Sequence, residues 1–258
     1  MPFVELGDLQ TCYELAGEGR AALVLSNSLG TTFSMWDPQM PQLAQRFRVL
    51  RYDTRGHGRS SVTPGDYTIE QLGRDVIALL DALKLDRVHF CGLSMGGMIG
   101  MWLGVHAPER LDRLVLCNTA ARIGTRESWN ARITAVRTEG MRSVAAGVME
   151  RWFTPEFRDA CLQKVAQAQQ MLENSSPEGY AANCAAIRDM DQRAEVARIT
   201  ARTLVICGTR DPVTPPSESQ FLTGRIRGAT GMELNAAHLS NVEQAEAFTD
   251  AVCSFLSR

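Results

Sequence analysis

The sequence predicts an α/β protein with a mostly parallel, doubly wound sheet, and three observations indicate this class. Short apolar runs that suit buried strands alternate with segments of helical periodicity. One run leads through a Gly-x-Ser-x-Gly turn straight into an apolar helix, between residues 88 and 106. The alternation stops at about residue 121 and resumes at about residue 191, and the segment between has helical composition without a strand-like run.

We therefore expect two parts. Residues 1–120 and 191–258 form the α/β core, and residues 121–190 form a helical cap over the site. The alternative is that the inserted helices extend the outer layer of the core. Breaks in the cap are expected near Gly140, Pro155 and the Ser-Ser-Pro sequence at 175–177.

Each element of the core follows from its residue pattern. A turn at Gly7-Asp8 and alternation over residues 10–15 predict a β-hairpin over residues 3–16, as an antiparallel edge of the sheet. Strand-like runs predict further strands at 21–26, 47–52, 88–91, 111–117, 203–207 and 231–234. Helical patterns predict helices at about 36–45, 69–84, 94–106, 218–224 and 242–256.

Composition excludes several classes of protein. The 258 residues are 45% hydrophobic and 22% charged, which is ordinary for a globular chain. The net charge of -2 without blocks of like charge argues against nucleic acid or an anionic membrane as partner. No secretory signal or membrane-spanning run is visible. Seven cysteines without Cys-x-x-Cys spacing indicate a reduced, cytoplasmic protein, and the oligomeric state stays open.

The sequence Gly92-x-Ser94-x-Gly96 lies where a strand is expected to give way to a helix, which is the context of a nucleophile elbow. In such a turn the serine hydroxyl is exposed, and small residues on either side let strand and helix cross closely. The serine also stands at a helix N-terminus, where free N–H groups can support an oxyanion. The alternative is a glycine-rich turn with a serine N-cap.

A serine nucleophile needs a base, and the chain offers four histidines. His89 lies inside the elbow strand, and His106 lies near the far end of the elbow helix. His57 is close to the expected site but precedes the serine, whereas the order in this kind of site is serine, acid, histidine. His238, in the loop after the last strand, is therefore the predicted base.

The imidazole needs an acid to hold its tautomer and to stabilise the imidazolium. Asp211 is the carboxylate in the loop between a buried strand and a helix, and it is the predicted acid. The alternative for Asp211 is a turn residue before proline. The other position used for the acid, at the end of the preceding sheet strand, is near Asn118, which cannot carry the charge.

The oxyanion hole should consist of two backbone N–H groups. We predict one from Met95, the residue after the serine, and one from Leu29, in the loop after the first buried parallel strand. Because these donors belong to the backbone, the prediction rests on position alone.

With elbow, acid, base and oxyanion loop in this arrangement, the whole chain resembles the α/β-hydrolase superfamily and, within it, the 3-oxoadipate enol-lactonase family. The elbow and the Gly56-His57-Gly58 loop indicate the superfamily only. The loop at 27–30 and strings in the cap indicate the lactonases, while Asn27-Ser28 departs from the His-Gly of many superfamily members. The strings that carry the resemblance are residues 26–32, 35–39, 51–58, 90–100, 117–124, 185–191 and 236–244.

This resemblance implies hydrolysis of 3-oxoadipate enol-lactone to 3-oxoadipate through a serine acyl-enzyme, with no metal or organic cofactor. The implied partner is thus a small lactone that carries a carboxylate, so the cap should supply a cation. The candidate substrate-binding residues are Trp129, as a flat apolar wall, and Arg122, Arg126, Arg132 and Arg137.

Three other readings stay open. A carboxylesterase, a carbon–carbon bond hydrolase or a perhydrolase would share the same serine, histidine and aspartate. A receptor-like member would bind a lactone without turning it over. Cysteine-based chemistry would need a thiol at an elbow, and none of the seven cysteines has that position.

Overall fold

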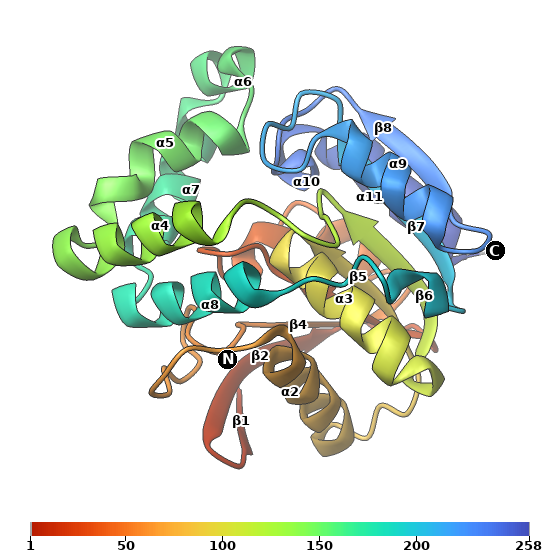
Figure 1. Ribbon diagram of the computed structural model, residues 1–258. Coiled ribbons are helices and arrows are strands. Elements are labelled where there is room, and N and C mark those ends of the chain that lie inside the picture. Colours follow the sequence, from red (N-terminus) through yellow and green to blue (C-terminus); the bar gives the residue numbers. More distant parts are fainter. Residues whose placement is uncertain (1, 258) are drawn as a thin grey trace.

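A computed structural model describes residues 2–257, and eight strands within this range form one sheet at the centre of the molecule (Figure 1). The strands are β1 Phe3–Leu6, β2 Leu9–Ala16, β3 Ala22–Ser26, β4 Arg48–Tyr52, β5 Val88–Leu93, β6 Leu111–Cys117, β7 Arg202–Gly208 and β8 Thr230–Leu234. Their spatial order is β1-β2-β4-β3-β5-β6-β7-β8. The pairs β1–β2 and β2–β4 are antiparallel and all others are parallel, which confirms the predicted antiparallel edge.

Helices cover both faces of the sheet. Helices α1 (Met40–Leu43) and α11 (Ala245–Leu256) contact each other on one face, and α2 (Ile69–Ala82), α3 (Met95–His106) and α9 (Pro216–Arg225) lie on the other. Helix α3 is apolar on all sides and buried along nearly its whole length, because it lies between the sheet and α2. Helix α2 buries one apolar stripe, formed by Ile69, Leu72, Val76, Leu79 and Leu80.

Two predicted helices are each divided in the structure. In place of one helix over 36–45, the chain forms a 3₁₀ turn at Phe33–Trp36 and then α1. Proline lacks an N–H, so Pro38 and Pro41 prevent a continuous hydrogen-bond ladder, although Pro41 is tolerated in the first turn of α1. The predicted helix at 242–256 begins earlier, as α10 (Ser240–Glu243), and is interrupted before α11 by Gln244, whose φ of -120° and ψ of 52° are not helical.

The segment between β6 and β7 is helical, as predicted. It contains α4 (Arg126–Glu139), α5 (Arg142–Trp152), α6 (Pro155–Ala160), α7 (Leu162–Glu173) and α8 (Pro177–Asp189). Hydroxyl side chains cap the N-termini of α4, α6 and α8, and Gly140 ends α4 with a φ of 78°. Figure 1 shows α4 to α7 gathered to one side of the sheet. We call residues 121–190 the cap; that they form a separate domain stays a prediction.

Helix α8 attaches the cap to the core. It approaches the loop after β4 so closely that a Cβ on Gly179 would lie 2.1 Å from the carbonyl oxygen of Gly56. The buried Asn183 side chain donates a hydrogen bond of 2.9 Å to the carbonyl oxygen of Arg55. The Tyr67 amide donates to the carbonyl of Ala182 at 3.1 Å. The close approach of Gly179 to Gly56 and these two hydrogen bonds fix α8 on the core.

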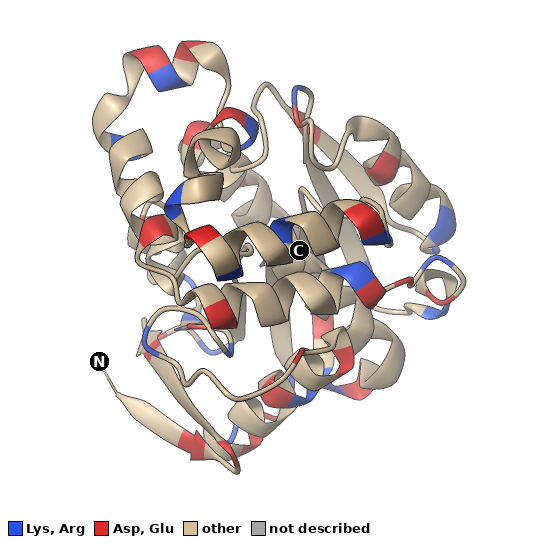
Figure 2. Ribbon diagram, turned by 60° about the vertical axis from the view of Figure 1, so that its left-hand side comes forward, with Lys and Arg blue, Asp and Glu red and all other residues tan. Residues whose placement is uncertain are grey.

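Basic and acidic residues are interspersed on the face shown in Figure 2, where no large region of one sign is seen. None of the helices in the described range combines the length and the hydropathy that a membrane span needs. The thiols of Cys91 and Cys117 lie 3.8 Å apart on neighbouring strands, and both are free and buried.

Candidate active site

Ser94 stands at the sharp turn between β5 and α3. Its φ of 55° and ψ of -114° are unfavourable for a residue with a side chain, at a cost of about 1–3 kcal/mol. The turn requires glycine at two positions, because any Cβ there would collide with the backbone. A Cβ on Gly92 would lie 2.1 Å from the Gly96 carbonyl oxygen, and a Cβ on Gly96 would lie 2.2 Å from the Ser26 carbonyl oxygen. The Ser94 amide donates to the Cys117 carbonyl at 2.8 Å. The two glycines thus let β3, β5 and α3 cross and present the serine.

Asp211 and His238 are brought together by the loops after β7 and β8. The distance between His238 Nδ1 and Asp211 Oδ2 is 2.8 Å, and both side chains are buried. The other carboxylate oxygen of Asp211 accepts from the amides of Val213 at 2.8 Å and Thr214 at 3.1 Å. The aspartate therefore orients the imidazole while its own loop holds it in place.

Asp211 is an anion at neutral pH. Burial by itself would raise the pKa of the carboxyl, but attraction to His238 and hydrogen bonds from His238, Asn118 and Thr214 outweigh burial and lower the pKa to about 2. With the carboxylate ionised, His238 Nδ1 is the donor in their hydrogen bond.

Asn118 is a site residue whose contribution sequence reasoning missed. It directly follows β6 and has a φ of 43°, and its Nδ2 donates to Asp211 Oδ2 at 2.9 Å and to the Ala237 carbonyl at 3.1 Å. Its Oδ1 accepts from the Ser240 hydroxyl at 2.6 Å. Asn118 therefore links the acid to both sides of the His238 loop. The available signal was its place at the end of a strand next to the one that carries the acid.

The amides of Leu29 and Met95 are placed so that they remain available to a ligand. In the described part of the chain neither N–H donates to another group. The loop that carries Leu29 is held by Asn27, whose side chain donates to the Tyr52 carbonyl at 2.7 Å and accepts from the Trp36 indole at 3.0 Å. Asn27, which stands where many members of the superfamily have histidine, thus holds this loop through its own side-chain hydrogen bonds.

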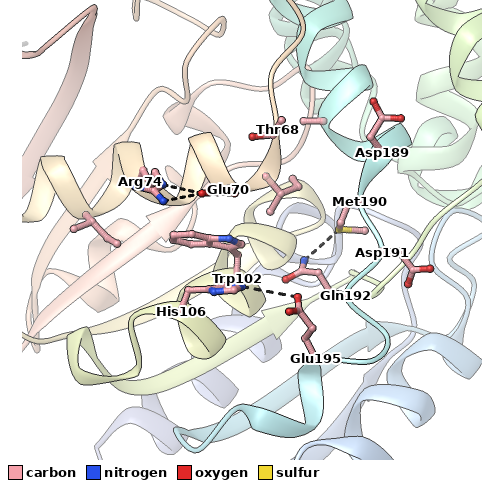
Figure 3. Close-up of a pocket in the computed structure, with 13 residues that line it drawn as sticks. Thr68, Glu70, Arg74, Trp102, His106, Asp189, Met190, Asp191, Gln192 and Glu195 are labelled. Carbon is pink, nitrogen blue, oxygen red and sulfur yellow. Dashed lines mark hydrogen bonds and ion pairs between the residues drawn. The ribbon is translucent and has the colours of Figure 1, made fainter.

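The remaining histidines have other surroundings. His57 Nε2 accepts from the Gly30 amide at 2.8 Å, and burial lowers the pKa of His57 to about 4, so this neutral ring supports the loop of Leu29. His89 lies near Asp112, at 3.3 Å. Figure 3 shows His106 in a wide groove beneath Trp102, with the ring centroids 4.9 Å apart.

Ser94 and His238 line the same cavity, which the cap covers. The cavity volume is about 40 Å³, enough for a few waters. Its walls are largely apolar, and among the described residues that line it there is no carboxylate. The residues that line it include Leu29, Trp129, Arg132, Arg151 and Trp152.

Comparisons with known proteins bear on this arrangement. A family model described as the alpha/beta hydrolase fold matches residues 21–245. Over the full chain, the sequence is 43% identical to 3-oxoadipate enol-lactonase 2 of Acinetobacter baylyi and covers 99% of that protein. The chain belongs to the α/β-hydrolase family. The predicted fold class is confirmed, and this α/β hydrolase is an enzyme.

Two further proteins support the narrower resemblance. The α/β hydrolase is 40% identical to 3-oxoadipate enol-lactonase 1 of the same organism, over 93% of this chain and 90% of that one. The crystal structure of the enol-lactonase from Burkholderia xenovorans LB400 superposes with a TM-score of 0.98 at 46% identity, with both chains fully covered. The resemblance to the enol-lactonases is therefore confirmed.

Of the four cap arginines predicted to bind substrate, one lines the cavity of this α/β hydrolase. Arg132 Cζ lies 5.1 Å from the centre of the Trp129 ring, and both residues line the cavity. The other three pair with carboxylates and are absent from the described lining. These pairs are Arg122 with Asp191 at 3.4 Å, Arg126 with Asp189 at 2.7 Å, and Arg137 with Glu178 at 3.2 Å.

Arg151 is a second cation of the cavity, and no local pattern of residues indicates it. Arg151 lines the cavity, and its Nη1 lies close to Gly147 on the same helix, 3.3 Å from the position that a Cβ on that glycine would take. Within residues 2–257 neither Arg132 nor Arg151 forms an ion pair with a carboxylate. Burial and the charge of Arg132 lower the pKa of Arg151. The cavity of the α/β hydrolase thus combines apolar walls with two guanidinium groups that lack an anion.

Proposed function

We propose that this α/β hydrolase opens 3-oxoadipate enol-lactone to 3-oxoadipate, through Ser94, His238 and Asp211. The observation that carries the proposal is that two guanidiniums without a carboxylate partner in the described range, Arg132 and Arg151, line the same small cavity as Ser94 and His238. A ligand with one apolar ring and one carboxylate complements this lining, because the carboxylate supplies the missing anion. The names of the relatives point to the same substrate.

The reaction begins with acylation. His238 takes the proton of the Ser94 hydroxyl, and the serine oxygen attacks the lactone carbonyl. The Leu29 and Met95 amides stabilise the oxyanion of the tetrahedral intermediate. When the ring C–O bond breaks, His238 gives its proton to the departing enolate oxygen. The enol stays attached to the acyl-enzyme and becomes a ketone by tautomerisation, which favours ring opening.

Deacylation uses the same groups in reverse. His238 takes a proton from water, and the resulting hydroxide attacks the ester carbonyl of the acyl-enzyme. The Ser94–carbonyl bond breaks, and Ser94 recovers its proton from His238. Asp211 stays ionised throughout and stabilises the imidazolium, as its low pKa requires. The acyl group leaves Ser94 as a carboxylate, which is the second carboxylate of the product. We assign the reaction to cytoplasmic catabolism of aromatic compounds by the β-ketoadipate pathway.

The test is loss of the ultraviolet absorbance of the enol-lactone with the purified protein. Wild type should consume the lactone far faster than a neutral nitrophenyl ester, and Ser94→Ala should be inactive on both substrates. Ester cleavage without lactone turnover would keep the serine mechanism and reject the lactone as substrate. Tight lactone binding with negligible turnover would instead support a receptor.

A further inference from the structure

The connection between α5 and α6 of the cap lies against the loop that carries His238. The Leu239 amide, one residue after the histidine, donates to the Trp152 carbonyl at 3.0 Å. Trp152 itself lines the cavity above Ser94. The chain segment at 152–156, which we call the cap connection, is therefore in contact with both the substrate space and the histidine loop.

Glu243 joins the cap connection to the other side of that loop. Its Oε2 accepts from the Ala237 amide at 3.0 Å and from the Thr154 amide at 3.3 Å. Its Oε1 accepts from the Thr154 hydroxyl. That hydroxyl in turn accepts from the Phe157 amide at 3.3 Å as the N-cap of α6. One carboxylate thus collects three donors, from the residue before His238 and from the start of α6.

Such a link matters because the cavity is smaller than its ligand. About 40 Å³ is far below the roughly 300–1,000 Å³ of ordinary small-molecule pockets, so the cap or its side chains must shift when a lactone enters. A second tie between cap and core, the ion pair of Arg210 with Glu156 at 2.7 Å, is exposed and therefore weak. The contacts of Glu243 reach the histidine loop through a side chain and add to the backbone bond between the Leu239 amide and the Trp152 carbonyl.

We propose that Glu243 is a positioning residue that couples the cap to His238, so that the placement of the base follows the placement of the cap connection. The proposal rests on the proposed function in that His238 serves as the base of Ser94 and that a ligand larger than the cavity enters beneath the cap. Closure of the cap over a substrate would then hold the His238 imidazole in position beside Ser94. Without this link, the histidine loop would be free to shift relative to Ser94.

The experiment compares Glu243→Ala with Glu246→Ala. Glu246 is exposed on α11 and its side chain makes no hydrogen bond or ion pair with any residue in the described range, so this variant is a matched control. Two rates are measured: kcat for the lactone, and modification of Ser94 by diisopropyl fluorophosphate. In that reagent step the serine oxygen displaces fluoride at phosphorus and His238 takes the proton, and the small neutral reagent does not need the cap arginines.

Glu243→Ala should lower both rates by about 10- to 100-fold, since misplacing a base by about 1 Å costs that much, while KM for the lactone changes little. Glu246→Ala should match wild type. Thr154→Val removes the hydroxyl partner from the cap side and should lower both rates, whereas Thr154→Ser should retain them. The double variant Glu243→Ala/Thr154→Val should be no slower than Glu243→Ala, because both changes break one link.

Unchanged rates in Glu243→Ala and Thr154→Val would overturn the proposal, as would effects that multiply in the double variant. If Glu243→Ala fails to fold, the comparison of Thr154→Val with Thr154→Ser decides alone. A wild type that reacts with the reagent but not with the lactone refutes the proposed substrate and leaves the test of Glu243 intact. A wild type that does not react with the reagent refutes the role of Ser94 and His238.

Discussion

Arg132 and Arg151 differ from the other basic residues of the cap because they lack a carboxylate partner in the described structure and line the cavity. Arg132→Ala should raise KM for the lactone by about 10- to 100-fold, since a hydrogen bond to a charged group contributes about 1.5–3 kcal/mol. Arg151→Ala should act in the same direction. Steady-state kinetics with the lactone and a neutral ester would measure both effects, and the ester should be unaffected.

Arg137→Ala is the matched control, because Arg137 belongs to the same helix as Arg132 but pairs with Glu178 and Asp66. Its KM for the lactone should equal that of wild type. An equal rise of KM in Arg132→Ala and Arg137→Ala would show that helix α4 was disturbed as a whole, and would count against a specific carboxylate contact.

His57 should make stability depend on pH. Burial, which outweighs the hydrogen bond with the Arg55 carbonyl, lowers its pKa from 6.5 to about 4. Between these values the unfolded chain binds a proton more readily than the folded protein, so the free energy of unfolding decreases as pH falls through this window. From pH 7 to pH 5 the contribution of His57 is a loss of about 2 kcal/mol.

Urea denaturation at pH 7 and pH 5 would measure this effect. His57→Gln cannot titrate, and its amide oxygen can still accept from the Gly30 amide, so the variant should lose about 2 kcal/mol less than wild type on acidification. The same pH dependence in wild type and variant would mean that a group other than His57 is responsible.

At the scale of single elements, the elbow depends on Gly96, whose Cβ would collide with the main chain of β3 at Ser26. Gly96→Ala should destabilise the protein by about 3 kcal/mol, because a backbone atom cannot move aside as a flexible side chain can. Gly224→Ala in α9 is the control: a Cβ there meets nothing within 4 Å, so it should stabilise by about 1 kcal/mol. Denaturation midpoints of the two variants should thus shift in opposite directions.

Most elements could be predicted because their signals are local. Strands such as β3 and β7 are continuous apolar runs, and the elbow has a short motif in its expected context. The helix predicted at 36–45 was wrong because Pro38 and Pro41 lack the N–H groups that a continuous helix over these residues would need. The early start of α10 and the interruption at Gln244 depend on contacts of the His238 loop, which no local pattern contains.

Asp211 and His238 could be proposed from the sequence because the order of serine, acid and histidine along the chain assigns each of them to one loop after a strand. The orientation of a cap helix was not predictable, because packing against α8 decides which face of α4 turns inward. Residues five positions apart on a helix point about 140° apart, so the face that turns Arg132 to the cavity turns Arg137 away. Arg151 was missed for the same reason, since its inward direction depends on how α5 lies over the core.

At the scale of the whole molecule, the cap is attached unevenly. Helix α8 is buried along its length and touches the core backbone at Gly56, whereas α7 buries only Ala168 and Leu172. Amide hydrogen exchange followed by mass spectrometry should therefore show slower exchange in α8 than in α7. Equal rates in the two helices would indicate that the cap opens as one unit, and would contradict an anchor at α8.

The sheet order also has a consequence for the chain while it is being synthesised. The loop of Leu29, the elbow serine and all cap helices precede β7, whereas the proposed base follows the edge strand β8. Under the proposed mechanism, a ribosome-bound chain thus contains the oxyanion donors, the nucleophile and the cap residues before it has any His238 to activate the serine. We therefore expect a chain that ends before β8 to be without hydrolytic activity, because it has Ser94 but not the proposed base.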